Sequence, residues 1–168
     1  VVSHNSTSLA SQGVISTASI PYFNTLYVTP LFEMVRRFSN NYVREFIDGA
    51  VFKKLWGLDK GRGNVLQRSF RNGSNMFFSY AFLDAERTRG VNADRVCFDE
   101  VQNLMFEFVP VILETLSGSS WALKQYAGTP KSKDNTIEKL WRMSSMAEWF
   151  IKCQTGGCNH WNIPALEF

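Results

Sequence analysis

RVCFDE, residues 95 to 100, is the stretch that decides the fold. The run that starts at Arg95 is short and apolar, which is typical of a buried strand. Asp99 and Glu100 follow at once, so this strand carries two carboxylates at its end. In a nucleotide-hydrolysing site the first acid can hold Mg²⁺ through the metal's water shell, and the second can polarise the attacking water. The same pair also suits a helix N-terminus, where acidic side chains complement the helix dipole.

The segments around this strand alternate between strand and helix patterns. The predicted strands are Thr25–Thr29, Val65–Phe70, Met76–Ala81, Arg95–Phe98, Trp121–Ala127 and Glu148–Lys152. The predicted helices are a short one within Ser3–Ser19, which Pro21 ends, and an amphipathic one over Phe32–Ile47, which is broken near Asn40-Asn41. A buried helix over Leu104–Leu116 is expected to be kinked at Pro110, and a short helix is predicted over Ile137–Trp141. This alternation favours an α/β fold, with a mostly parallel sheet flanked by helices.

Two glycine-containing segments define the predicted turns. Gly57–Asn64 is rich in glycine and is predicted as a loop. Asn72-Gly73 predicts a β-hairpin insertion whose two turn residues both have φ > 0. Ligands of parallel sheets lie at the carboxyl ends of the strands. We therefore expect the polar clusters after Val28, Phe98 and Ala127 to meet at one edge.

Composition bounds the class of protein. The chain has 168 residues, the size of one domain, and 45% of them are hydrophobic. No apolar run is long enough to span a bilayer and no signal peptide opens the chain, so we expect no membrane partner. Three cysteines, an odd number, favour a reducing cytoplasm over a disulfide scaffold, and a net charge of +3 weakly supports a polyanionic partner. Because the first residue is Val1, we expect a fragment or a processed product.

Two further polar clusters suit the same hydrolytic chemistry. Arg89-Gly90 lies upstream of the acids, and an arginine near a γ-phosphate stabilises charge in the transition state. Gly128-Thr129-Pro130 follows the predicted strand Trp121–Ala127, where small residues and a threonine can sense a phosphate. Each cluster also has a simpler interpretation, a solvated or ion-paired arginine in the first case and an ordinary turn in the second.

Three blocks, in this order, carry a family resemblance. They are YVTPLFEMVRRFSNNYV (Tyr27–Val43), LQRSFRNGSNMFFSYAFLDAERTRGVNADRVCFDEVQ (Leu66–Gln102) and YAGTPKSKDNTIEKLW (Tyr126–Trp141). Together they resemble the ATPase domain of the large terminase subunit of tailed bacteriophages, and ERTRGVNADRVCFDEVQ is their most specific element. The resemblance covers nearly the whole chain and implies a RecA-like P-loop NTPase fold.

The resemblance implies roles for the candidate residues. It makes Asp99 the Walker B aspartate, Glu100 the catalytic glutamate and Gly128-Thr129-Pro130 the coupling motif, with Arg89 as a further catalytic candidate. It implies ATP and Mg²⁺ as cofactors, and hydrolysis that drives double-stranded DNA into a procapsid. The implied partners are a homo-oligomeric ring of the same subunit, the small terminase subunit and the portal, all in the host cytoplasm.

The phosphate loop departs from the family's pattern. Such a loop needs a Gly-rich turn followed by Lys and then Ser or Thr, whereas this chain has HNST at residues 4 to 7. The nucleotide-binding candidates are therefore Asn5, Ser6 and Thr7, and either Ser6 or Thr7 can ligate Mg²⁺ beside Asp99. Asn5 replaces the lysine, and an amide cannot supply the lysine's charge to the β- and γ-phosphates. We therefore expect weak or absent ATP hydrolysis by this chain.

The last part of the chain holds a possible metal motif. CQTGGCNHWNIP, which starts at Cys153, resembles the first half of a zinc-ribbon insertion seen in some terminases. Cys153 and Cys158 are the candidate zinc ligands, with His160 as a third, and a structural zinc site needs four. The alternative is two free thiols on a turn. Cys97 lies in mid-strand and is expected to be a core residue.

The predicted organisation is a motor domain over residues 1–150 that starts within the phosphate loop. Residues 151–168 then begin a truncated zinc-ribbon-like insertion or a linker. Three functions stay open on the sequence: a terminase ATPase, a non-hydrolysing binding or assembly module with the same fold, and a helicase-type motor core. Asn5 favours the second, and the Asp99-Glu100 pair favours the first. No cluster of three acids suits a two-metal nuclease, so we expect no DNA cleavage.

Overall fold

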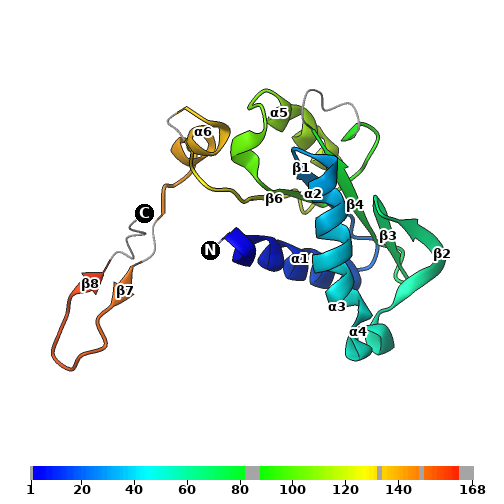
Figure 1. The fold of residues 1–168 in the computed structure, drawn as a ribbon, viewed down its shortest axis with the longest axis horizontal. Coiled ribbons are helices and arrows are strands. Elements are labelled where there is room, and N and C mark those ends of the chain that lie inside the picture. Colours follow the sequence, from blue (N-terminus) through cyan, green and yellow to red (C-terminus); the bar gives the residue numbers. More distant parts are fainter. Residues whose placement is uncertain (1, 82–87, 132–133, 148–149, 163–168) are drawn as a thin grey trace.

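The computed structural model describes residues 2–81, 88–131, 134–147 and 150–162, and of residues 2–5 and 60–63 it describes the backbone only. Helices and strands alternate through most of the chain (Figure 1). The strands are β1 (Thr25–Thr29), β2 (Leu58–Asn64), β3 (Gln67–Phe70), β4 (Asn75–Tyr80), β5 (Arg95–Phe98), β6 (Leu123–Tyr126), β7 (Ile151–Lys152) and β8 (Trp161–Asn162). The helices are α1 (Val2–Ser19), α2 (Phe32–Arg37), the π-helix η1 (Phe38–Val43), α3 (Arg44–Asp48), α4 (Ala50–Leu55), the 3₁₀ helix η3 (Val101–Asn103), α5 (Phe108–Leu113), the 3₁₀ helix η4 (Glu114–Leu116) and α6 (Thr136–Arg142).

Six strands form one sheet, in the order β2-β3-β4-β1-β5-β6. Strands β4, β1, β5 and β6 run parallel, and β3 and β2 are added antiparallel on one side. This arrangement confirms the predicted α/β fold with its mostly parallel sheet. All five residues of β1, in the middle of the parallel part, are buried, as expected where helices cover both faces of a sheet.

Two apolar cores cover the two faces of the sheet. On one face, α1, η1 and α3 pack over a cluster that includes Tyr27, Phe78 and Cys97. On the other face, η3, α5 and η4 pack over a cluster that includes Leu26 and Phe98. Successive side chains of a strand point to opposite faces, so Tyr27 faces α1 while Leu26 faces α5. Cys97 is buried, which confirms its predicted place in the core.

The β3–β4 hairpin confirms the predicted insertion, but its turn differs from the expected one. Gly73 has a positive φ of 82°, whereas Asn72 does not adopt the left-handed conformation. The Asn72 amide instead donates to the carbonyl oxygens of Thr17 and Ala18, each at 2.9 Å, and of Ile20 at 3.1 Å. Carbonyls at the end of a helix have no partner within the helix. The hairpin turn therefore caps α1.

Two of the predicted segment types are wrong. α1 fills the whole of Val2–Ser19 instead of a short part of it. The hydroxyls of Ser11, Ser16, Thr17 and Ser19 bond back to carbonyls of the preceding turn, as Thr17 does to Gly13 at 2.7 Å, and the helix continues through all of them. Gly57–Asn64 is largely strand β2, which pairs with β3 through backbone groups that glycine also carries.

The two longer predicted helices are broken into shorter pieces. The expected break near Asn40-Asn41 is the π-helix η1 between α2 and α3. Of Leu104–Leu116, only Phe108–Leu113 is α-helical. Pro110 lies in the first turn of this helix. An N–H at this position would have no partner within the helix, so the proline breaks no helical hydrogen bond and the predicted kink is wrong.

The chain leaves the sheet after β6 and continues into α6. Beyond it, β7 and β8 pair antiparallel, with Lys152 opposite Trp161. We call residues 150–162 the C-terminal arm, which Figure 1 shows at a distance from the sheet. Within the ranges that the structure describes, no helix has the length and apolar character needed to cross a membrane.

Candidate functional site

The carboxyl ends of β1, β5 and β6 meet at one edge of the sheet. Phe98, the last residue of β5, lies opposite Val28 on β1 and opposite Tyr126 on β6. The backbone continues this contact past the strand, because the Asp99 N–H donates to the Val28 carbonyl at 2.9 Å. The residues that follow these strands are therefore neighbours, as expected at the carboxyl edge of a parallel sheet.

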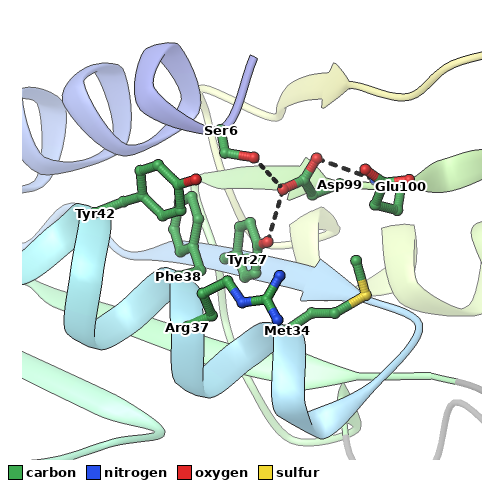
Figure 2. Close-up of a pocket in the computed structure, with 8 residues that line it drawn as sticks. All are labelled: Ser6, Tyr27, Met34, Arg37, Phe38, Tyr42, Asp99 and Glu100. Carbon is green, nitrogen blue, oxygen red and sulfur yellow. Dashed lines mark hydrogen bonds between the residues drawn. The ribbon is translucent and has the colours of Figure 1, made fainter. Parts of the chain in front are cut away.

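Asp99 is buried at this edge, with 5% of its surface exposed, and its carboxylate accepts three hydrogen bonds. Oδ2 accepts the Ser6 hydroxyl at 3.1 Å and the Tyr27 hydroxyl at 2.8 Å, and Oδ1 accepts the Glu100 N–H at 3.0 Å. Figure 2 shows the Ser6 and Tyr27 side chains converging on Asp99 from α1 and β1. Three donors from three parts of the chain hold this carboxylate in one orientation.

Tyr27 is the member of this group that the sequence analysis missed. Its ring is buried and stacks on Phe38 with 3.7 Å between the ring centroids. Burial raises the pKa of the Tyr27 hydroxyl well above its ordinary value, and the charge of Asp99 raises it further, so Tyr27 stays a hydrogen-bond donor. The alternation along β1 was the available signal, because it places Tyr27 on the face opposite Leu26 and Val28.

Glu100 begins the segment after β5 in an uncommon backbone conformation. Its φ of 52° and ψ of 40° lie in the left-handed region, which non-glycine residues rarely adopt. Its carboxylate accepts a hydrogen bond from Nε2 of Gln102 at 2.5 Å. Oε1 of Gln102 in turn accepts the Thr129 N–H at 3.1 Å. The Gln102 side chain therefore links Glu100 to the predicted coupling segment Gly128-Thr129-Pro130. Gln102 is the second residue that the sequence analysis missed.

A cavity of about 250 Å³ lies in front of the two acids. Its lining residues come from α1, β1, α2, η1 and the end of β5, and they are Ser6, Tyr27, Met34, Arg37, Phe38, Tyr42, Asp99 and Glu100. A water occupies roughly 30 Å³, so the cavity has room for a hydrated cation and phosphate oxygens. The Arg37 side chain runs along its wall (Figure 2) and brings a positive charge that suits an anionic ligand.

The sequence candidates divide into those at the cavity and those away from it. Ser6 lines the cavity beside both acids, whereas Thr7 is exposed on α1. Asn5 lies in the α1 backbone one residue before Ser6. Arg89 is exposed and is not among the lining residues; the arginine at the cavity is Arg37. The roles assigned to these residues stay predictions.

The oxygen atoms at the cavity are suitable ligands for Mg²⁺. Asp99 and Glu100 supply carboxylates and Ser6 a hydroxyl, and Mg²⁺ prefers oxygen ligands while keeping several waters. Among the side chains that the structure describes, no group of three or more His, Cys, Asp and Glu is placed to hold a metal ion. A cation held by one carboxylate, a hydroxyl, waters and phosphates is consistent with this arrangement.

The predicted zinc ligands lie on the C-terminal arm. The Cys153 N–H donates to the His160 carbonyl at 2.9 Å, which closes the turn between β7 and β8. A hydrogen bond from the Thr155 hydroxyl lowers the pKa of the Cys153 thiol, with smaller contributions from the Thr155 N–H and from Cys158. Both thiols are partly exposed and neither is in a disulfide. Zinc binding by Cys153, Cys158 and His160 stays a prediction.

Comparison with solved structures places this fold among phage terminases. A point variant of the large terminase ATPase domain of Thermus phage P74-26 matches with a TM-score of 0.63 and 16% identity, over 90% of this chain and 64% of that one. The HK97 bacteriophage large terminase matches with a TM-score of 0.61 and 12% identity, over 79% of this chain and 28% of that one. The large terminase of a thermophilic bacteriophage in complex with ADP matches with a TM-score of 0.51 and 14% identity, over 72% of this chain and 29% of that one.

These likenesses define the class of fold. The chain has the mixed α/β architecture of terminase ATPase domains, which is the RecA-like fold that the sequence predicts. It spans less than two thirds of the length of each of these structures. No protein-family model matches the sequence, and no curated protein matches it.

Proposed function

We propose that this chain is the ATPase domain of a viral terminase large subunit, which couples ATP hydrolysis to the packaging of double-stranded DNA into a procapsid. The observation that carries the proposal is the Asp99 carboxylate at the end of β5, hydrogen-bonded to Ser6 of α1 and followed directly by Glu100. The terminase fold supports it, and so does the ADP complex of one structural neighbour.

Each residue at the cavity has a part in this chemistry. Asp99 and the Ser6 hydroxyl would hold a hydrated Mg²⁺, which would neutralise phosphate charge at the cavity. Tyr27 fixes the Asp99 oxygen that it donates to, and thereby orients the carboxylate. Glu100 accepts a hydrogen bond from the attacking water and turns it toward the γ-phosphate. The Arg37 guanidinium supplies positive charge at the cavity wall.

A second candidate function is a non-hydrolysing nucleotide-binding or assembly module with the same fold. Asn5 favours this function. It lies near the start of α1, at the position where the family has a lysine. An amide lacks the charge that a lysine brings to the β- and γ-phosphates. Turnover by this chain is therefore expected to be weak, and Asn5→Lys is expected to increase it.

Nucleotide binding and turnover together test the proposal. Titration with a fluorescent ADP, with and without Mg²⁺, measures binding, and phosphate release from ATP measures turnover. We expect Mg²⁺-dependent binding that Asp99→Asn weakens by about tenfold, since the substitution removes the charge that holds the cation. Glu100→Gln keeps the binding and removes the turnover, both in this chain and in the Asn5→Lys variant.

Glu107→Gln is the matched control, because Glu107 is an exposed carboxylate a few residues further along the same segment. It is expected to change neither binding nor turnover. Absence of Mg²⁺-dependent ADP binding in both the unchanged chain and the Asn5→Lys variant contradicts the proposed function. Binding without turnover in both favours the non-hydrolysing module. Vigorous turnover by the unchanged chain refutes the effect assigned to Asn5.

The partners of the proposed motor follow from the same assignment. They are double-stranded DNA, further copies of this subunit in a ring, the small terminase subunit and the portal, in the host cytoplasm. Pelleting of the chain with linear DNA at low and high salt tests the first of these, because contacts to phosphates weaken as salt rises.

A further inference from the structure

The Gln102 side chain lies between the Asp99-Glu100 segment and the Gly128-Thr129-Pro130 segment, to which the proposed function gives separate roles. Gln102 is buried, with 9% of its surface exposed. Its Nε2 donates to Oε2 of Glu100 at 2.5 Å, and its Oε1 accepts the N–H of Thr129 at 3.1 Å. One side chain therefore joins the acid after β5 to the backbone after β6.

Hydrogen-bond chemistry fixes the direction of this amide. The Glu100 carboxylate can only accept and the Thr129 N–H can only donate. Nε2 must therefore face Glu100, and Oε1 must face Thr129. The reversed amide would place two acceptors together on one side and two donors together on the other, so the bridge has a single arrangement.

Gly128 provides the space for the bridge. A methyl group on Gly128 would collide with Oε1 of Gln102 and would lie 3.2 Å from the N atom of Val101. The φ of Gly128 is not in the left-handed region, so its backbone conformation is open to other residues. Oε1 of Gln102 occupies the place that a side chain of residue 128 would take, so a larger residue here would displace the Gln102 amide.

Neighbouring contacts keep the two segments together without Gln102. The Val101 N–H donates to the Ala127 carbonyl at 3.0 Å, and Lys131 donates to the side chain of Asn103 at 3.1 Å. Loss of the Gln102 amide alone is therefore expected to leave the segments packed. The particular property of Gln102 is that it contacts the Glu100 carboxylate itself.

We propose that Gln102 is a positioning residue that orients the Glu100 carboxylate and passes a change in its position to the backbone of Thr129. The inference rests on the proposed function, in which Glu100 acts on water and Gly128-Thr129-Pro130 couples hydrolysis to movement. The bond from Gln102 occupies one carboxylate oxygen of Glu100 and leaves the other for the water. When Glu100 turns away from Gln102, the Thr129 N–H loses its fixed acceptor.

The amide signal of Thr129 in ¹⁵N-labelled chain, without nucleotide, tests the bridge. Gln102→Ala is expected to shift this signal and to speed its hydrogen exchange about three- to tenfold, the effect of one lost hydrogen bond. Glu100→Ala is expected to shift it in the unchanged chain but not in the Gln102→Ala background. Equal shifts by Glu100→Ala in the two backgrounds would overturn the proposal, since a merely structural Gln102 gives additive changes.

Two further variants separate the halves of the bridge without removing the side chain. Gln102→Glu can still accept the Thr129 N–H but cannot donate to Glu100, so Thr129 should stay protected while its response to Glu100→Ala disappears. Gly128→Ala displaces Oε1 of Gln102 and should also remove that response. Asn103→Ala is the matched control, because Asn103 is an exposed neighbour whose side chain bonds to Lys131 and not to the Glu100 carboxylate, and the substitution keeps its backbone N–H bond to the Glu100 carbonyl. It should leave the response intact.

Addition of Mg²⁺ and ADP distinguishes failure of this inference from failure of the proposed function. With binding, the Thr129 signal should move further in the unchanged chain than in Gln102→Ala. No binding in either protein contradicts the proposed function, while the nucleotide-free experiment still decides the bridge. Equal movement in both proteins overturns transmission through Gln102.

Discussion

The carboxyl end of β5 and the C-terminal arm differ in how their residues are held. After β5, Asp99 is 5% exposed and accepts hydrogen bonds from three donors. On the arm, Ile151 and Trp161 are 56% and 57% exposed, and they belong to paired strands of two residues each. The first region is specified by burial from both faces of a sheet. The second is held by a few backbone bonds around a turn. A change of one side chain should therefore matter in the body of the protein and matter little on the arm.

The two kinds of cysteine should show the largest contrast between these regions. Burial raises the pKa of Cys97 to about 12, whereas hydrogen bonds with Thr155 lower the pKa of Cys153. The thiolate is the reactive form of cysteine, and the fraction of thiolate increases as pH rises through the pKa. At pH 8 we expect Cys153 to react with iodoacetamide more than about a thousandfold faster than Cys97. Mass spectrometry of peptides over a time course measures both rates.

The pH dependence of labelling sharpens this comparison. The Cys153 rate should level off at a lower pH than that of an ordinary cysteine, and the Cys97 rate should stay negligible until the protein unfolds. Labelling of Cys97 in the folded chain at a rate near that of Cys153 contradicts the burial described for β5.

Removal of a large side chain should separate the two regions in stability. Phe98 is fully buried and stacks on Tyr126, with 5.1 Å between ring centroids. Phe98→Ala is expected to lower the free energy of unfolding by about 3–5 kcal/mol, through lost burial and the cavity that remains. Trp161→Ala, on the arm, should change it by less than about 0.5 kcal/mol. Urea denaturation followed by circular dichroism compares the two, and equal losses would refute the distinction.

Two asparagines offer a smaller test of the same contrast. Asn72 donates three hydrogen bonds to carbonyls at the end of α1, while Asn162 makes one exposed bond of 3.4 Å to Ile151. Asn72→Ala is expected to cost about 1–3 kcal/mol, because it leaves half-buried acceptors without their donor. Asn162→Ala should cost almost nothing. Denaturation curves for both variants decide this, and an unchanged midpoint for Asn72→Ala would show that water replaces the cap.

Metal removal should have the smallest effect on the body. The candidate zinc ligands lie on the arm, so EDTA is expected to shift the free energy of unfolding of the sheet by less than about 0.5 kcal/mol. Metal analysis of the purified chain tests the zinc hypothesis directly, and zinc far below one equivalent dismisses it. A large loss of stability in EDTA would instead show that the arm and the body fold together.

The sequence predicted the elements whose pattern is local. β1, β5 and the β3–β4 hairpin follow from short apolar runs and from the Asn72-Gly73 turn. β2 was not predicted, because the glycines of Gly57–Asn64 give no side-chain pattern and the strand exists through pairing with β3. The fold class followed from the alternation of elements, and it is also the part that the terminase structures support.

The candidate site was predictable only in part, for a related reason. The Asp99-Glu100 pair is contiguous in the sequence, and Ser6 stood out through its resemblance to a phosphate loop. Tyr27 contacts Asp99 across a separation of 72 residues, and Gln102 contacts Thr129 across 27. Such contacts depend on the order of strands in the sheet, and no spacing along the chain encodes that order.

The π-helix η1 makes the cavity wall sensitive to insertion and deletion. Phe38 and Tyr42, which lie about one turn apart in η1, both line the cavity next to Arg37 of α2. A π-helical turn holds one residue more than an α-helical turn, so deletion of one residue from Phe38–Val43 would restore an ordinary α-helix while α2 and α3 keep their relative orientation. Arg37 would stay at the cavity, but the side chains that η1 presents to it would change. The single extra residue in η1 therefore sets which side chains face the cavity, and we expect changes of length to be tolerated less here than on the arm.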